Sequence, residues 1–205
     1  MKIEMLTTGF YFTNSYIISN DNNECIIIDP GLGYGEAAKA IKAKYKPLAI
    51  LITHAHMDHI DGIQYFSNLP IYLYKDEEKV FNDPNLNLYE MIGRVSPYQS
   101  TDLDMRRVYD LEEINISDFK FKVYHTPGHT PGSCCYLFGD NDLFTGDTLF
   151  NESCGRCDFP GGSYSLMEDS LARIMNTFKD DVKCYPGHND ITNIGYERIH
   201  NPYIK

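Results

Sequence analysis

The segment Thr53-His54-Ala55-His56-Met57-Asp58-His59 decides both the expected fold and the expected chemistry. The apolar run before it predicts a buried strand, and the polar residues within it predict a break that leads into a helix. His54 and His56 are two residues apart, so an extended chain turns both rings to one side. Asp58 and His59 follow at the start of the helix and can point to a neighbouring position. Four potential ligands within six residues indicate a metal site rather than a polar surface loop.

These four ligands are too crowded to bind one small ion with good geometry, so they indicate two neighbouring metal positions, each short of ligands. Three further ligand types follow glycines in turns after predicted strands. They are His129 in Thr126-Pro127-Gly128-His129-Thr130-Pro131-Gly132, Asp147 in Thr145-Gly146-Asp147-Thr148, and His188 in Tyr185-Pro186-Gly187-His188-Asn189. Because a packed strand fixes the backbone that presents the ligand, we expect these three residues to complete the site.

The elements predicted around these motifs alternate between strands and helices. Short runs rich in β-branched and aromatic residues predict strands at 16–18, 25–28, 48–53, 71–74, 119–125, 134–138 and 142–145. Apolar spacing predicts helices at 35–45, 58–67 and 163–178. The polar stretch 82–104 is predicted to be a loop or lid, with a short helix near 86–92. The order suggests two sheets with helices on their outer faces, although the pattern also fits an ordinary α/β sheet.

Length and composition limit the classes of function. The 205 residues can bury a sizeable core, and no repeat or linker divides them, so we expect one domain, residues 1–205. The net charge of −11 disfavours a nucleic-acid partner. The sequence has no secretory signal and no apolar run of about 20 residues, which favours a cytoplasmic location without a membrane partner. Reduced thiols are then expected at Cys25, Cys134, Cys135, Cys154, Cys157 and Cys184.

The set of seven ligands resembles the metallo-β-lactamase fold superfamily from about Thr13 to the C-terminus. The resemblance implies an α/β fold, an αββα four-layer sandwich with the metal site at one edge of the two sheets. It also implies two divalent metal ions, with zinc as the first expectation and iron or manganese as alternatives. His54, His56 and His129 would hold the first ion. Asp58, His59 and His188 would hold the second, and Asp147 would bridge the two.

Three segments are similar to the short members of the glyoxalase II (hydroxyacylglutathione hydrolase) branch: 146–150, the loop 154–162, and Gly195-Tyr196-Glu197-Arg198 with Asn201-Pro202. This similarity implies hydrolysis of a small-molecule thioester by a metal-bound hydroxide, with the thiolate leaving without a strong general acid. Asp58 and Asp147, which would hold the ions that share the hydroxide, are assigned to catalysis. Full-length members carry a C-terminal helical extension that contributes to glutathione binding. This chain stops at Lys205, so its thiol carrier is left open.

An oxygenase is the main alternative. Persulfide dioxygenases resemble glyoxalase II, carry a Cys-Gly-Arg-x-Asp-Phe loop like the one starting at Cys154, and use one iron held by residues equivalent to His54, His129 and Asp147. Cys157 departs from that loop, and the C-terminal segment favours a hydrolase. The histidine at position 56 disfavours a flavo-diiron protein. The short length disfavours a nuclease, and the intact ligand set disfavours a non-catalytic module. Asp58-His59 and the missing export signal disfavour β-lactam hydrolysis.

Several residues near the motifs have more modest interpretations. Asp29 either caps a turn or orients a ligand histidine. His125 and His200 fall outside the ligand pattern and are predicted to be structural. The Cys154-x-x-Cys157 pair is more consistent with two thiols than with a redox disulfide. Arg156 and Asp158 are predicted to form an ion pair that shapes their loop.

Overall fold

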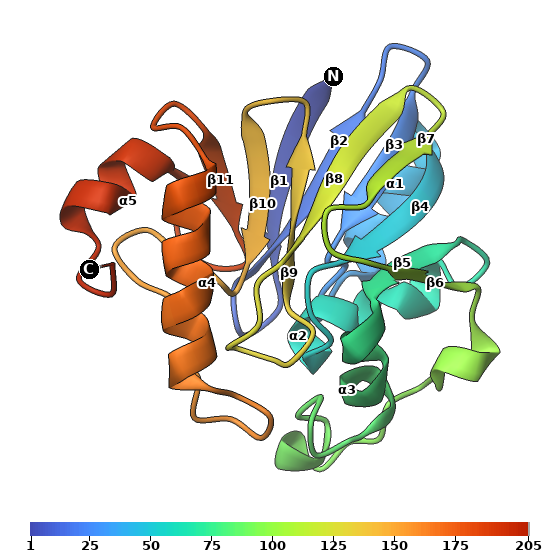
Figure 1. Cartoon of the computed structure of the whole chain (residues 1–205). Coiled ribbons are helices and arrows are strands. Elements are labelled where there is room, and N and C mark those ends of the chain that lie inside the picture. Colours follow the sequence, from blue (N-terminus) through green and yellow to red (C-terminus); the bar gives the residue numbers. More distant parts are fainter. Residues whose placement is uncertain (205) are drawn as a thin grey trace.

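The polypeptide forms two six-stranded sheets in a computed structural model that describes residues 1–204 (Figure 1). The first sheet has the order β1-β2-β3-β4-β5-β6, and its strands are Lys2–Thr8, Thr13–Ser19, Glu24–Ile28, Lys46–Ile52, Ile71–Tyr74 and Met105–Val108. The second has the order β12-β11-β10-β9-β8-β7. Numbered from β7 to β12, its strands are Glu113–Ile116, Phe119–His125, Cys134–Phe138, Asp142–Gly146, Lys183–Pro186 and Thr192–Asn193.

Both sheets are mixed. In the first sheet β1, β2 and β3 pair antiparallel, and β3, β4, β5 and β6 pair parallel. In the second sheet only β10 and β11 pair parallel among the described strands. Parallel neighbours end at the same edge of a sheet, so the loops that follow them can meet there.

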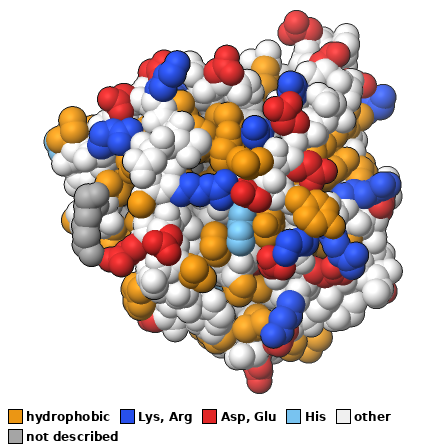
Figure 2. Space-filling model, in the orientation of Figure 1, with side chains coloured by type: hydrophobic (Ala, Val, Ile, Leu, Met, Phe, Trp, Pro, Cys, Tyr) orange, Lys and Arg blue, Asp and Glu red, His pale blue; other side chains and the backbone are white. Residues whose placement is uncertain are grey.

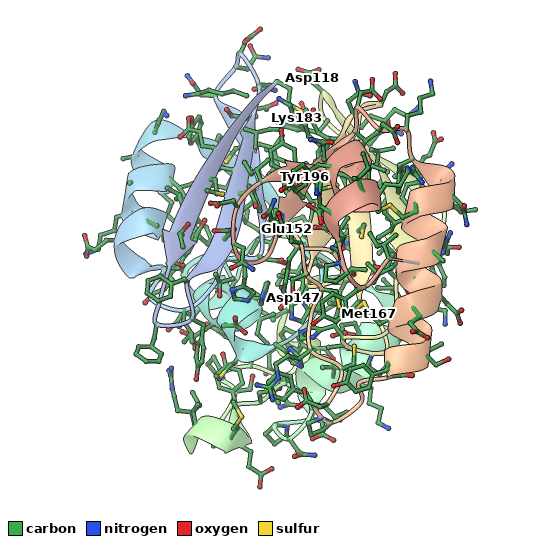
Figure 3. All side chains as sticks on the ribbon, turned by 90° about the vertical axis from the view of Figure 1, so that its left-hand side faces the viewer. Asp118, Asp147, Glu152, Met167, Lys183 and Tyr196 are labelled. Carbon is green, nitrogen blue, oxygen red and sulfur yellow. The ribbon has the colours of Figure 1, made fainter. Side chains whose placement is uncertain are left out.

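The helices cover the outer faces of the two sheets. The α-helices α1 to α5 are Gly35–Lys44, Met57–Ile60, Glu78–Asn82, Tyr164–Thr177 and Ile194–His200. Single-turn or short 3₁₀ helices η1 to η4 lie at Asp61–Tyr65, Lys75–Glu77, Glu90–Ile92 and Ser100–Asp102. Figure 3 shows the layers from the side, with α1 on the left, the sheets in the middle and α4 on the right. The expectation of an αββα sandwich is therefore confirmed.

Alternation along the strands explains why both faces of each sheet are buried. In β2, Tyr16 and Ile18 pack between the sheets, whereas Ile17 packs towards α1. In β8, Phe121 packs between the sheets and Tyr124 packs towards α4. Because both faces of these strands are buried, successive residues are apolar. The runs are therefore continuously apolar instead of alternating with polar residues.

The long helix α4 follows its predicted pattern closely. The Ser163 side chain caps its start by accepting a hydrogen bond from the Leu166 amide at 3.4 Å. Its buried face packs on the second sheet through Met167, Leu171, Ile174 and Met175.

Two predicted elements are wrong in part. The helix expected at 58–67 ends as an α-helix at Ile60 and continues as the 3₁₀ helix η1. The Gly62 amide there donates to the Pro30 carbonyl at 2.8 Å rather than to its own helix. The helix expected at 86–92 is one turn at Glu90–Ile92. Leu88, with φ of 69°, interrupts it.

The stretch 82–104 is also less open than its polar composition predicts. Asn87 and Tyr89 are fully buried. The Tyr89 hydroxyl donates to Asp61 at 2.9 Å, and the Asn87 carbonyl accepts from the Met57 amide at 2.9 Å. These bonds pack the middle of the stretch against α2, beside the predicted metal ligands.

One hydrogen bond between the sheets gives a test of their packing. The buried Tyr136 hydroxyl on β9 donates to the Ile52 carbonyl at the end of β4, at 2.8 Å. Tyr136→Phe removes that donor, so we expect the metal-free protein to lose about 1–2 kcal/mol of unfolding free energy in urea titrations. Tyr109→Phe, at a residue 52% exposed, serves as the control. Equal losses in the two variants would contradict this role.

Candidate metal centre

All seven predicted ligands lie at one edge of the two sheets. His54 and His56 follow β4, and Asp58 and His59 begin α2. The other three lie after β8, β10 and β11, and are His129, Asp147 and His188. Figure 3 labels Asp147 in the lower middle of the molecule, between the two halves. Residues 134 positions apart in sequence thus meet because four strands end at the same edge.

Three of the histidines form a first cluster. One ligand atom each of His54, His56 and His129 lie within 4.8 Å of one another. The Nε2 atoms of all three are buried and have no hydrogen-bond partner. Burial, joined by the charge of neighbouring histidines, lowers the pKa of all three side chains, so they are neutral at pH 7. Neutral imidazole is the form that binds a metal, and unpaired buried nitrogens need such a partner.

The second cluster contains Asp58, His59 and His188. The Asp58 Oδ2 atom lies 3.3 Å from His188 Nε2 and 3.6 Å from His59 Nε2, and the two Nε2 atoms are 3.4 Å apart. Ligand atoms about 2.0–2.1 Å from a tetrahedral ion are about 3.3 Å from each other. The spacing therefore suits a shared ion better than direct hydrogen bonds, which favour about 2.7–3.2 Å.

Asp147 lies between the two clusters. Its Oδ2 atom is 3.4 Å from Nε2 of His129 in the first cluster and 3.5 Å from Nε2 of His188 in the second. Its Oδ1 atom, 3.5 Å from His59 Nε2, is buried without a hydrogen-bond partner. One carboxylate therefore faces both candidate ion positions.

The charges in the second cluster are strongly coupled. Burial alone would lower the pKa of His59, but Asp58, Asp147 and Asp29 outweigh it and raise that pKa to about 10. Burial likewise opposes the ionised Asp58, yet His59 and His188 hold the pKa of this carboxyl well below its usual range. Buried carboxylates require a positive partner. In the absence of metal, His59 takes that role as a protonated side chain.

Asp29 orients one of the ligands, which settles its two interpretations. Its Oδ2 atom accepts from His59 Nδ1 at 2.9 Å and from the Thr53 hydroxyl at 2.6 Å. Its Oδ1 atom accepts from the Thr53 amide at 2.8 Å. With its Nδ1 atom engaged, His59 must present Nε2 to the cluster.

Two further ligands have partners that the sequence pattern does not reveal. The Thr13 hydroxyl donates to Asp58 Oδ2 at 2.8 Å. His129 Nδ1 lies 2.6 Å from the Arg156 carbonyl, so it donates there and leaves Nε2 free. Thr13 belongs to no motif, and Arg156, although it lies in the 154–162 loop, contacts His129 through its backbone carbonyl, which the residue type does not reveal.

Glu77 is the main residue that the sequence reasoning missed. It is fully buried and accepts at 2.8 Å from the Ala55 amide, the Thr130 hydroxyl and the Gly132 amide. Burial raises its pKa to about 7, although the three hydrogen bonds oppose the shift. It connects the loop of His54 and His56 with the loop of His129. Glu77 lies within the charged run Lys75-Asp76-Glu77-Glu78-Lys79, which is typical of an exposed surface. The sequence therefore gives no sign that Glu77 is buried.

Gly187 shows why glycine precedes a ligand in this turn. A Cβ atom there would collide with Asp147 Oδ1 and His59 Cε1. Any larger residue would therefore displace Asp147 or His59. The glycine in Pro186-Gly187-His188 is therefore explained by the close packing of the candidate ligands.

A cavity of about 420 Å³ opens beside the ligands. Ligands from both clusters and Asp147 line it. The rest of the lining is mostly apolar and comes from the β1–β2 turn, the 82–104 stretch and the loops after β10: Tyr11, Met57, Leu88, Met91, Phe150 and Phe159, with the polar residues Ser153, Cys154, Arg156 and Asn189.

The remaining sequence predictions near the site hold. Arg156 and Asp158 form a two-bond ion pair at 2.8 and 2.9 Å. The six cysteines, all within residues 1–204, are free. His125 stacks on Tyr74 with ring centres 4.0 Å apart and bonds the Pro131 carbonyl, so its role is structural. His200 lies on α5, outside the ligand clusters.

The surface agrees with the acidic composition. Acidic and basic side chains are interspersed over the face in Figure 2. Among residues 1–204, no helix combines the length and apolar character needed to cross a membrane.

Two curated relatives are similar over nearly their whole length. The chain is 32% identical to the "Probable metallo-hydrolase YqgX" of Bacillus subtilis, covering 100% of this chain and 98% of that protein. It is 28% identical to the "Hydroxyacylglutathione hydrolase GloC" of Haemophilus influenzae, with the same coverage.

Three solved structures share the architecture. BLEG-1, described as a B3 metallo-beta-lactamase, has a TM-score of 0.90 at 34% identity, covering 100% of both chains. TTHA1623 in a di-iron-bound form has a TM-score of 0.83 at 28% identity, covering 98% of this chain and 100% of that one. ETHE1 from Myxococcus xanthus has a TM-score of 0.76 at 27% identity, covering 98% and 84%.

These similarities extend over the whole of the two sheets. The family model for the metallo-beta-lactamase superfamily matches residues 8–188, from the end of β1 to the last of the seven ligands. The chain belongs to the metallo-beta-lactamase superfamily.

Proposed function

We propose that this chain is a binuclear metal hydrolase that cleaves small-molecule thioesters. The position of Asp147 carries the proposal. A carboxylate that faces two neighbouring ligand clusters, at 3.4–3.5 Å from His129, His188 and His59, is suited to hold two ions at once. The similar structure TTHA1623 is described in a di-iron-bound form, which supports the binding of two ions in this architecture.

The donor set fits divalent ions. His54, His56 and His129 would hold the first ion, Asp58, His59 and His188 the second, and Asp147 both. Zinc suits this mixture of imidazole and carboxylate ligands, and iron or manganese would also fit. When bound, such a pair supplies a water-derived nucleophile near neutral pH and positive charge for a developing oxyanion.

The protein's own contribution is to fix its ligands before metal arrives. Asp29 holds His59, the Arg156 carbonyl holds His129, and the Thr13 hydroxyl holds one oxygen of Asp58. The contacts to the two histidines engage Nδ1 and leave Nε2 directed at the clusters. The contact to Asp58 restrains its carboxylate. Catalysis then needs little rearrangement of the two aspartates proposed to act in it, Asp58 and Asp147.

A thioester suits this site because its leaving group is undemanding. Thiols are far more acidic than alcohols or amines, so a thiolate departs without a strong general acid. The similarity to a hydrolase named for hydroxyacylglutathione supports this class. We also propose a small-molecule partner, rather than nucleic acid or membrane, and a cytoplasmic location, where the six thiols would stay reduced.

The relatives also support two competing reactions. ETHE1 shares 27% identity with this chain, and it keeps open the persulfide dioxygenase alternative with one iron. BLEG-1, described as a metallo-beta-lactamase, shares 34% identity and keeps open β-lactam hydrolysis. The same experiment tests both of these reactions alongside thioester hydrolysis.

One purified preparation decides among these reactions. We expect about two divalent ions per chain by elemental analysis, and thioester hydrolysis that chelation abolishes and zinc restores. Oxygen uptake with a persulfide and turnover of a chromogenic β-lactam are measured in parallel. A single iron with oxygen consumption and no thioesterase activity would reject the proposal. So would β-lactam turnover that exceeds thioester turnover in kcat/KM.

Single ligand variants test the division into two positions. Because Asp147 faces both clusters, Asp147→Ala should weaken both steps of a zinc titration. His188→Ala should weaken mainly one step and leave a chain that binds about one ion. The measurement is metal bound per chain after dialysis against buffered zinc. Equal weakening of both steps by His188→Ala would argue against the assignment.

Glu77 gives a test that touches no ligand. In Glu77→Gln the carboxamide oxygen can still accept from Thr130 and Gly132, but its NH₂ group then faces the Ala55 amide, donor against donor. We expect about tenfold weaker zinc binding at the first position. Measuring it in the His188→Ala background isolates that position.

Asp76→Asn is the matched control for this variant, because Asp76 is the exposed neighbour of Glu77 and forms an ion pair with Lys75. Unchanged zinc affinity in Glu77→Gln would show that the buried bridge does not position His54 and His56.

A further inference from the structure

The cavity beside the ligands has an apolar wall built from two separate segments. Leu88 and Met91 come from the 82–104 stretch, and Tyr11 comes from the turn between β1 and β2. Leu88 is 6% exposed, whereas Met91 is 58% exposed, so the wall runs from a fixed base to an open rim. Phe150 and Phe159, from the loops after β10, add two aromatic rings to the lining. A group bound here would lie against carbon rather than against hydrogen-bonding atoms.

A single cationic side chain, Arg156, is found among the described residues that line this cavity. Its guanidinium already makes two hydrogen bonds to Asp158, at 2.9 and 2.8 Å. Its central carbon also lies 4.3 Å from the ring centre of Phe159, so one face of the guanidinium is covered. The charge that could attract an anionic substrate is therefore neutralised within its own loop.

Other charges near the cavity do not compensate for this pairing. Asp58 and Asp147 would be offset by the two divalent ions proposed to bind them, and among the described residues no Lys, Arg, Asp or Glu other than these two and Arg156 lines the cavity. Glutathione conjugates carry two carboxylates and one ammonium group, and hence a net negative charge. Beyond the metal positions, the described lining therefore offers the carboxylates of such a substrate no free lysine or arginine side chain.

We propose that the substrates of this chain are thioesters whose thiol part is uncharged and apolar, and that anionic glutathione conjugates are poor substrates. The inference rests on the proposed thioesterase function and names its substrate class. Arg156, Asp158 and the apolar wall with Met91 are the residues that set the preference. The residues proposed to hold the metal ions would support hydrolysis, and the apolar wall would determine which thioesters bind beside them.

Three thioesters of one acyl group test the preference on the metal-saturated full chain. The thiols are N-acetylcysteamine, glutathione and glutathione diethyl ester, which keeps the tripeptide skeleton but replaces both carboxylates with uncharged ethyl esters. We expect kcat/KM to be at least tenfold higher for N-acetylcysteamine than for glutathione, and severalfold higher for the diethyl ester than for glutathione. A glutathione value equal to or above that of its diethyl ester would overturn the inference but leave the thioesterase intact. No hydrolysis of any of the three by protein carrying two metals would reject the proposed function itself.

Asp158→Asn should relax the preference by freeing Arg156. The exposed pair is worth about 0.2–1 kcal/mol, so kcat/KM for the glutathione thioester should rise by up to about fivefold. The value for N-acetylcysteamine should change less. Asp104→Asn is the control, because Asp104 forms a similar exposed pair with Arg106, at 2.7 and 2.9 Å, outside the cavity. Equal changes for both substrates in Asp158→Asn would contradict the role of this pair.

Met91→Asn tests the apolar wall from its rim. It should lower kcat/KM for the N-acetylcysteamine thioester severalfold, mainly through KM, because apolar contact is lost. Val95→Asn is the matched control, since Val95 is 83% exposed and does not line the cavity. Identical behaviour of the two variants would mean that the wall does not contact substrate.

Discussion

The carboxylate of Asp29 holds together the part of the molecule on which the metal centre depends. It stands at the end of β3, receives the Thr53 amide and hydroxyl at the end of β4, and receives His59 from α2. Its backbone lies at φ of 49°, a conformation that residues other than glycine rarely adopt. Three elements therefore converge on one side chain held in an unusual conformation. Without it, the segment 54–59 would have neither a fixed start nor an oriented histidine.

Glu77 plays the corresponding role between the two sheets. It ties the loop after β4, in the first sheet, to the loop between β8 and β9, in the second. Both carboxylates are buried and accept several hydrogen bonds; those of Glu77 come from two amides and a hydroxyl, whereas Asp29 also contacts His59. The first cluster thus inherits its geometry from two acidic residues that never face a substrate. Buried polar bridges of this kind are sensitive to the loss of a single partner, since an unsatisfied group in the interior is destabilising.

The seven candidate ligands can be picked out from the sequence because they lie at strand ends, or at the start of the helix that follows one, in motifs with fixed spacing. The αββα sandwich follows from the same motifs through resemblance, whereas apolar patterning alone leaves an ordinary α/β sheet open. Edge strands such as β6 and β7 are missed because their residues are partly exposed and mixed in character. Glu77 is missed for a different reason: burial of a charged residue depends on partners 22 and 55 positions away. No local pattern encodes such contacts, and the buried Asn87 and Tyr89 within 82–104 show the same limitation.

The wide sequence span of the ligands has a consequence for how the protein matures. The first ligand is His54 and the last is His188, which lies beyond β11 in the second sheet. A growing chain can offer the segment 54–59 early, but the first cluster also needs His129, which follows β8, and the second needs His188, which follows β11. Contacts of such separation form late in folding. The complete set of seven candidate ligands can therefore come together only after β11 has paired with β10, at an edge where four distant parts of the chain meet.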